Sequence, residues 1–252
     1  MIPPSPIRLG AIGLIAGIAS GLFGIGGGLV MVPAMLTFTS LRQHEAHASS
    51  LGAVVPIASV ASIPFIAAGL VHWPFAAAMA LMAMIGARGG AAVMARMSER
   101  QLRVAFMLLM LFVAARLLIG ADATGASPDE TGAAAFLLPG LAIGLLAGLA
   151  SALFGIGGGL IMVPLMVLAG MPQHLAQGTS LVAIVPSAIV GARAHQRRGY
   201  LQIAAVIPMG IGGVIGGFAS SLVALGLDAA LLQRGLAVLL VVAVTQLARR
   251  PT

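Results

Sequence analysis

Two glycine-rich stretches are the residues best suited to chemistry in this sequence. The segment LFGIGGGLVMVP, residues 22–33, places four glycines within five positions, and LFGIGGGLIMVP recurs at residues 153–164. A helix that restarts at about Gly28 or Gly159 presents unsatisfied backbone N–H groups and the positive end of its dipole, which favours an anion. Glycine also lets the backbone approach a ligand closely because it has no Cβ. We therefore predict that a small anion binds at these two breaks, to residues Gly26, Gly27, Gly28, Gly157, Gly158 and Gly159.

Small polar side chains follow each glycine stretch. The segments QHEAHASSL, residues 43–51, and QHLAQGTSL, residues 173–181, match at an offset of 130 residues (173 − 43). Their hydroxyls could donate to an anion, coordinate a cation through oxygen, or satisfy helix N-termini, and we expect the last role for at least two of them. A histidine pair in the first copy is spaced to share a metal, but the second copy has glutamine at one of the two positions, so no metal site is predicted. The predicted substrate-binding set therefore also includes His44, Ser49, Ser50, Thr179 and Ser180.

Arg88 is a charged residue within an apolar run, about fourteen residues into the stretch at 74–95. A charge near the centre of a bilayer costs at least ~2.5 kcal/mol and usually faces a cavity or a partner. The acidic residues of the chain all lie in connections or at the ends of apolar runs. Two interpretations stay open: the anionic substrate is the partner of Arg88, or its guanidinium snorkels toward the inner membrane face.

The composition places these residues in a membrane. Apolar residues make up 60% of the chain and charged residues 8%, whereas soluble domains are roughly half apolar and a quarter charged. Apolar runs of about 18 residues or more are typical of membrane spans. They lie at about 7–39, 46–70, 74–95, 101–120, 133–170, 175–192, 201–227 and 230–248. We predict an all-α, polytopic helical membrane protein.

The duplication divides the chain into a first transmembrane repeat at 1–120, a linker at 121–132 and a second repeat at 133–252. The runs at 7–39 and 133–170 are too long for one span and each contains a glycine stretch, which predicts a helix, a break and a second helix. If the break reverses the chain, the arginine clusters near Arg100 and Arg198 share one face, which is the cytoplasmic one by the positive-inside rule.

We expect a multi-pass protein of the cell's inner membrane. In that topology the acidic linker lies outside the cell membrane and both termini lie in the cytoplasm. Each repeat then holds a glycine-broken helical hairpin and three further spans, and the two repeats are inverted relative to each other. Ladders of small residues, such as Gly13, Gly17 and Gly21, are interpreted as close helix contacts.

Several classes of function are excluded or disfavoured by missing residue types. The chain has no Cys and no Lys, so it offers no thiolate metal site and no Walker phosphate loop. We interpret the net charge of +7 as arginines that set the orientation of the spans in the membrane, and not as a sign of nucleic-acid binding. No nucleophile, base or metal cluster appears within the spans, so an enzyme and a cofactor are not expected. Coupling, if present, would use Na⁺ bound by carbonyls and hydroxyls, or exchange of anions.

The duplicated GIGGGxxMVP break, followed by H-x-x-x-x-[ST]-S-L, resembles the TauE/SafE family of membrane transporters, over about residues 7–248. The resemblance implies transport, and specifically export, of sulfite, sulfoacetate or related organosulfur anions. The residues themselves predict a secondary transporter with its anion near the bilayer midplane, working by alternating access. A passive anion channel is the alternative. The expected partners are the small anion and the lipid bilayer, and a homodimer is left open.

Overall fold

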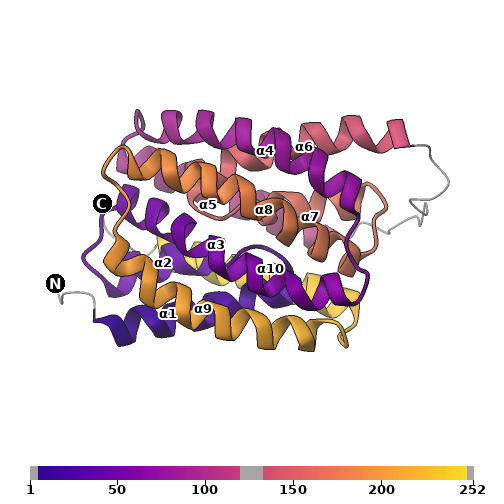
Figure 1. The fold of residues 1–252 in the computed structure, drawn as a ribbon. Coiled ribbons are helices and arrows are strands. Elements are labelled where there is room, and N and C mark those ends of the chain that lie inside the picture. Colours follow the sequence, from indigo (N-terminus) through magenta and orange to yellow (C-terminus); the bar gives the residue numbers. More distant parts are fainter. Residues whose placement is uncertain (1–4, 120–132, 249–252) are drawn as a thin grey trace.

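The computed structural model describes residues 5–119 and 133–248, and the regular elements within these ranges are helices (Figure 1). The predicted linker at 121–132 lies outside the described residues. The helices before it are α1 (Pro6–Phe23), α2 (Gly28–Phe38), α3 (Gln43–Ala67), α4 (Trp73–Met94) and α5 (Glu99–Ile119). Those after it are α6 (Ala133–Phe154), α7 (Gly159–Leu168), α8 (Gln173–Gln196), α9 (Ile203–Ala224) and α10 (Ala229–Ala248).

Within the described residues, five helices, α1, α3, α4, α8 and α9, are long and apolar enough to cross a membrane. The 25 residues of α3, at 1.5 Å per residue, extend about 37 Å, which exceeds the roughly 30 Å of a hydrocarbon core. Large apolar side chains on the outer face of α9, such as Ile211 and Ile215, are more than 60% exposed, as lipid contact requires. The predicted all-helical class and the multiple spans are confirmed.

Helices from the two parts of the chain pair through small residues. Helix α1 packs along α9 and α6 packs along α4. A Cβ added to Gly17 would lie 2.1 Å from the carbonyl oxygen of Gly213, and one added to Gly148 would lie 2.1 Å from that of Ala83. Backbones can approach this closely only where the side chain is a hydrogen atom. The expectation that the small-residue ladders mediate close helix contacts is confirmed.

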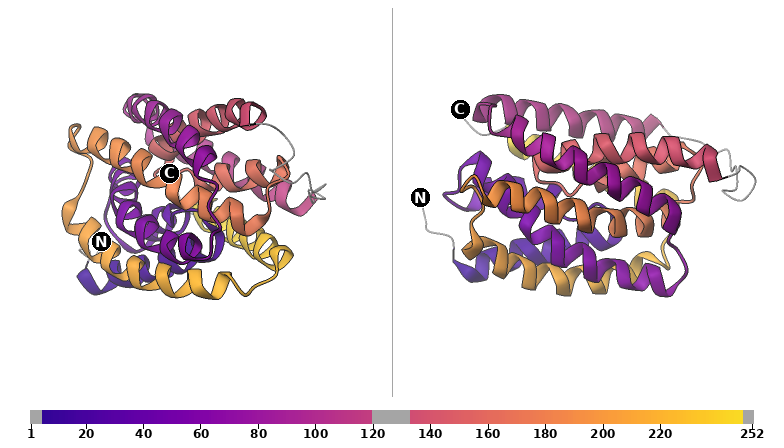
Figure 2. Two further views of the ribbon diagram at one scale, coloured as in Figure 1. Left: turned by 45° about the vertical axis from the view of Figure 1, so that its right-hand side comes forward. Right: turned by 45° about the horizontal axis from the view of Figure 1, so that its top comes forward.

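The helices correspond one by one across the chain, α1 to α6 through α5 to α10, and their corresponding ends lie 127 to 131 residues apart. Their packing corresponds too. The contact between α1 and α9 is matched by the one between α6 and α4, and the contact between α3 and α9 is matched by the one between α8 and α4. Helices α3 and α8 pack against each other, and the views in Figure 2 place this pair between α1 and α9 on one side and α4 and α6 on the opposite side. The glycine breaks lie beside the central pair.

Candidate functional site

The two glycine stretches interrupt helices as predicted. In the first, Gly24, Gly26 and Gly27 have φ values of 71°, 81° and 82°. In the second, the equivalent glycines have φ values of 67°, 82° and 91°. Side chains other than hydrogen are disfavoured in this left-handed region, which is why the break requires clustered glycines. Helices α2 and α7 restart at Gly28 and Gly159, so the predicted positions of their N-termini are confirmed.

Each break turns the chain back along the helix that precedes it. A Cβ at Gly27 would lie 2.7 Å from the carbonyl oxygen of Ala16, which is seven residues before the last residue of α1, Phe23. In the second copy, a Cβ at Gly158 would lie 3.2 Å from the carbonyl oxygen of Ala147. The short helices α2 and α7 therefore begin beside the middle of α1 and α6 and not at their ends.

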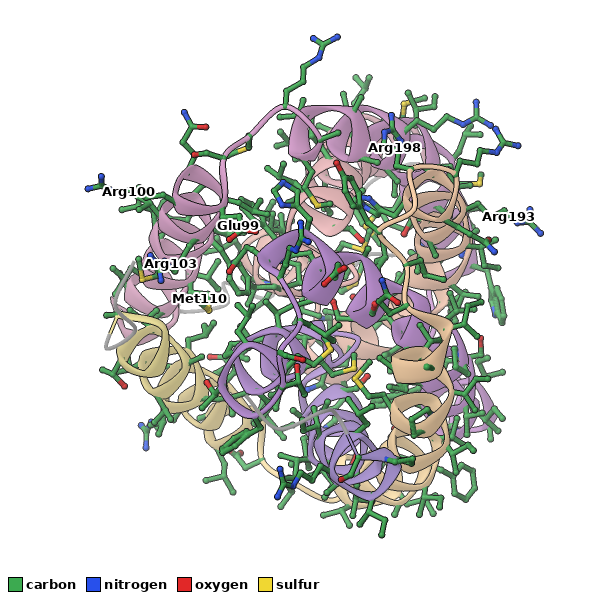
Figure 3. The ribbon with its side chains drawn as sticks, turned by 90° about the vertical axis from the view of Figure 1, so that its left-hand side faces the viewer. Glu99, Arg100, Arg103, Met110, Arg193 and Arg198 are labelled. Atoms are coloured by element: carbon green, nitrogen blue, oxygen red, sulfur yellow. The ribbon has the colours of Figure 1, made fainter. Side chains whose placement is uncertain are left out.

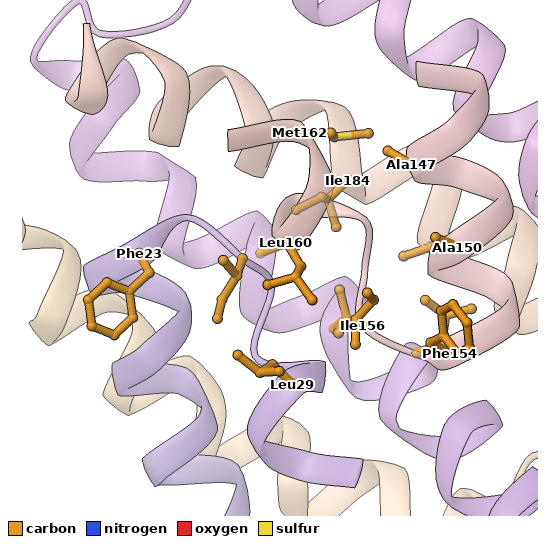
Figure 4. Close-up of a cluster of buried hydrophobic side chains, with 14 of the residues drawn as sticks. Phe23, Leu29, Ala147, Ala150, Phe154, Ile156, Leu160, Met162 and Ile184 are labelled. Atoms are coloured by element: carbon orange, nitrogen blue, oxygen red, sulfur yellow. The ribbon is translucent and has the colours of Figure 1, made fainter. Parts of the chain in front are cut away.

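The two breaks pack against each other in the interior. A Cβ at Gly28 would lie 2.1 Å from the carbonyl oxygen of Gly155, and one at Gly159 would lie 2.4 Å from that of Gly24. Residues 24–28 and 155–159 are all buried. Figure 4 shows the two loops side by side, with Leu29, Ile156, Leu160 and Ile184 among the apolar side chains around them. In this conformation the breaks fill each other's space.

Backbone N–H groups at the start of α2 and α7 lack acceptors. Among the described residues, no hydrogen bond is formed by the N–H groups of Gly26, Gly27 and Gly28, nor by those of residues 157–159. The first N–H groups that are bonded lie further along, where Val30 and Met31 donate to the carbonyl of Gly27 at 3.1 and 3.2 Å. A buried donor without an acceptor costs about 1–3 kcal/mol. The two breaks therefore gather unsatisfied donors, and an anion would satisfy them.

Two serine hydroxyls that the sequence analysis missed lie beside these donors. Ser20 and Ser151 are completely buried, and neither hydroxyl has a hydrogen-bond partner in the described structure. The Cβ of Ser151 would lie 3.5 Å from a Cβ added at Gly158, which places this side chain at the start of α7. Ser20 occupies the equivalent position 131 residues earlier. The signal was available in the sequence, because both copies have serine three residues before the phenylalanine that precedes the break.

Ser50 and Ser180, predicted to bind substrate, connect each central helix to the break of the other repeat. The hydroxyl of Ser50 donates to the carbonyl oxygen of Gly155 at 2.8 Å, and that of Ser180 donates to Gly24 at 3.0 Å. Both side chains are buried. The structure therefore brings these two residues together with the predicted glycines, although their hydrogens point to carbonyl oxygens in this conformation.

Ser49 and Thr179 lie one residue earlier and contact different partners. The hydroxyl of Ser49 accepts the backbone N–H of Gln202 at 3.0 Å, and that of Thr179 accepts the backbone N–H of His72 at 2.9 Å. Gln202 and His72 are the N-cap residues of α9 and α4. The expectation that at least two of the hydroxyls satisfy helix N-termini is confirmed, with the difference that these helices are not the ones on which the hydroxyls lie.

A second pair of polar contacts sits at the ends of α1 and α6, and the sequence analysis did not assign it. The buried ring of His47 donates from Nδ1 to the carbonyl oxygen of Phe154, while its Nε2 accepts from the amide of Gln43 at 2.9 Å. At the equivalent position, Gln177 donates from Nε2 to the carbonyl oxygen of Leu22 at 2.8 Å, and its Oε1 has no partner. These contacts bind carbonyl groups in the last turn before each break, directly before Gly155 in the second copy and two residues before Gly24 in the first.

The other two predicted site residues lie apart from the breaks. The Nε2 of His44 contacts the carbonyl oxygens of Met94 and Met97 at 3.2 and 3.1 Å, and so connects the start of α3 to the end of α4. Arg88 is exposed and lines a groove with arginines of α8. Within the described part of the chain, no group of three or more His, Cys, Asp or Glu side chains could hold a metal ion.

The fold and these contacts define a class: a helical, multi-span membrane protein with two paired, glycine-broken helices in its interior. The family model described as "Sulfite exporter TauE/SafE" matches residues 1–117 and 140–252, and the chain belongs to this family. A "Probable membrane transporter protein" of Xylella fastidiosa (strain 9a5c) is 31% identical over 221 residues, which cover 86% of this chain and 84% of the relative. The "Probable membrane transporter protein YunE" of Bacillus subtilis (strain 168) is 27% identical over 218 residues, covering 78% and 80%.

No solved structure matches the chain. The family and the names of the relatives indicate a membrane transporter and not an enzyme.

Proposed function

We propose that this protein is a secondary transporter that exports small organosulfur anions, such as sulfite or sulfoacetate, by alternating access. The observation that supports it most is the group of unsatisfied donors at the start of α2 and α7. The N–H groups of residues 26–28 and 157–159 have no acceptor among the described residues, and the hydroxyls of Ser20 and Ser151 have no partner there. An oxyanion with several oxygens, such as sulfite or a sulfonate, accepts hydrogen bonds from many directions. The positive ends of two helix dipoles add to the attraction.

In the proposed cycle, the arrangement in which the two breaks pack against each other is the closed one. Because a Cβ at Gly28 would already lie 2.1 Å from Gly155, an anion can enter only when the two breaks separate. Separation also breaks the hydrogen bonds from Ser50 and Ser180 to the break carbonyls. The released hydroxyls can donate hydrogen bonds to the bound anion. The released carbonyl oxygens could coordinate Na⁺ if Na⁺ is the coupling ion. Exchange of anions is the other coupling scheme.

We propose further that the two repeats are inverted in the membrane. This proposal is supported by the packing between the repeats: the first helix of each repeat packs along the fourth helix of the other repeat. Inverted repeats with interrupted helices place a substrate site at the repeat interface near the midplane. In this topology both termini and the arginine clusters face the cytoplasm, and the protein lies in the cell's inner membrane.

Single-cysteine labelling tests the inverted topology, because the chain has no native Cys. Three exposed residues are suitable positions. Ser98 follows α4, Gln196 is the last residue of α8, and Ala68 follows α3. A membrane-impermeant thiol reagent is expected to reach S98C and Q196C from the same face and A68C from the opposite face. Labelling of S98C and Q196C from opposite faces would contradict the inversion.

Transport into proteoliposomes tests the function. We expect saturable accumulation of labelled sulfite or sulfonate against its gradient, which a passive channel cannot produce. Ser20→Ala and Ser151→Ala should each weaken anion binding about tenfold or more, because a hydrogen bond to a charged group contributes roughly 1.5–3 kcal/mol. Ser187→Ala is the matched control, since the buried Ser187 hydroxyl already donates within its own helix to Ile184 at 2.8 Å. Equal binding and flux in all variants would refute the proposed site.

A further inference from the structure

Four arginines from two helices line one groove of about 590 Å³ at one end of the bundle. Three of them lie in or just after the last turn of α8, and the fourth is on α4, six residues before its last residue, Met94. Figure 3 looks along the bundle from this end and labels two of these arginines, Arg193 and Arg198. The groove is lined by Arg88, Val190, Arg193, Ala194, Arg197 and Arg198.

The charge of this groove is not compensated within the described part of the chain. None of its four arginines forms an ion pair there, and the hydrogen bond that involves one of them runs from Nη1 of Arg198 to the carbonyl oxygen of Ala194 at 3.0 Å. All four side chains are exposed. Guanidinium groups bind phosphate oxygens in a planar, bidentate geometry, and four of them around one groove provide donors for a single phosphate group.

The surface that leads into the groove is apolar. Leu81, Ile85 and Arg88 lie at positions i, i+4 and i+7 of α4 and so share one face of that helix. Leu81 and Ile85 are 53% and 52% exposed. A ligand in the groove therefore meets charge at one end and a lipid-facing stripe along α4 at the other. Such a surface fits an amphiphile better than a freely soluble anion.

We propose that the groove binds the headgroup phosphate of an anionic phospholipid, whose acyl chains lie along Leu81 and Ile85. Basic pockets between membrane helices are suited to anionic lipid headgroups, and each arginine near the membrane surface contributes about a fivefold gain in affinity. The site is separate from the glycine breaks, and its existence does not depend on which anion the protein transports. It also accounts for Arg88, whose charge lies within the apolar run that α4 forms.

Lipid binding by the purified, detergent-solubilised full chain tests the proposal. Native mass spectrometry with phosphatidylglycerol should show retained lipid, and phosphatidylcholine of the same chain length should be retained less. The double variant Arg193→Gln/Arg197→Gln should lower the affinity for phosphatidylglycerol roughly 25-fold. The matched control is Arg96→Gln/Arg100→Gln, which removes the same charge from two exposed residues that do not line the groove, one after α4 and one in the first turn of α5.

Each outcome decides the question. Selective loss in the groove variant, with both variants folded by thermal unfolding, supports the lipid site. An equal loss in the groove and control variants would mean that general surface charge attracts the lipid, and would overturn the proposal. Equal retention of the two lipids would overturn it as well. Displacement of phosphatidylglycerol by millimolar inorganic phosphate would assign the groove to a soluble anion instead. Full affinity in the single variant Arg88→Gln would contradict the proposed placement of the lipid against α4.

Discussion

Gly28→Ala tests whether the two breaks pack by direct backbone contact. Gly28 begins α2 and does not lie among the glycines with positive φ, so alanine can adopt its backbone conformation without strain. The added Cβ would lie 2.1 Å from the carbonyl oxygen of Gly155 and 2.5 Å from the Cα of Ile156. The shorter contact is 0.9 Å below the 3.0 Å that real Cβ atoms keep. Both neighbours are backbone atoms and cannot rotate away, so the two breaks must separate.

The expected cost follows from this overlap. Forcing one extra methyl group into a packed interior costs about 1–3 kcal/mol, and the higher helix propensity of alanine offsets at most ~1 kcal/mol of it. We expect a net loss of roughly 1–2 kcal/mol. For a chain of this size, that loss corresponds to a decrease in Tm of about 2–8 °C.

Thermal unfolding of the purified protein in detergent measures this difference. Gly89→Ala is the control, because Gly89 lies within α4 and a Cβ there would meet nothing within 4 Å. The control should unfold at the wild-type Tm or somewhat above it. If Gly28→Ala is as stable as Gly89→Ala, the breaks do not contact each other as described, and the argument that an anion must separate them is wrong.

Three further predictions concern the contacts around the breaks. Ser50→Ala removes the hydroxyl that donates to Gly155 and should lower stability by about 1 kcal/mol; an unchanged Tm would argue against this contact. His44→Ala should lower the Tm, because the contact between α3 and α4 is lost, and the anion affinity should stay at the wild-type value. A large loss of anion affinity would show that His44 belongs to the substrate site. Gly17→Val, whose Cβ would lie 2.1 Å from the carbonyl oxygen of Gly213, should sharply reduce the monodisperse fraction in size-exclusion chromatography, and normal yield would contradict the close α1–α9 contact.

The elements could be predicted from the sequence because their causes are local. Apolar runs of sufficient length predict spans, and four glycines in five positions predict an interruption, since three of them adopt backbone angles that other residues disfavour. The restart of α2 and α7 at Gly28 and Gly159 follows from the same pattern. The ladders of small residues predicted close packing, although the sequence did not say which helices would be partners.

The contacts of the site depend on distant parts of the chain, which is why sequence reasoning did not reach them. Ser50 and Gly155 are 105 residues apart, and their hydrogen bond follows from the packing of α3 beside the break of the other repeat. The missing partner of the Ser20 hydroxyl is a property of its surroundings, not of its residue type. Arg88 had two interpretations, and only the fold shows that it shares a groove with arginines more than a hundred residues away, such as Arg193.

The proposed transport depends on the unsatisfied backbone donors of the two breaks, which bind the anion. NMR of the ¹⁵N-glycine-labelled protein in lipid nanodiscs can observe these donors, in a titration with sulfite under conditions where thermal stabilisation demonstrates binding. We expect the amide protons of Gly26, Gly27 and Gly28, and of residues 157–159, to shift downfield. Those of Gly69 and Gly199, whose surroundings are open, should stay in place. Binding that leaves the amides of both breaks unmoved would contradict the proposed anion site.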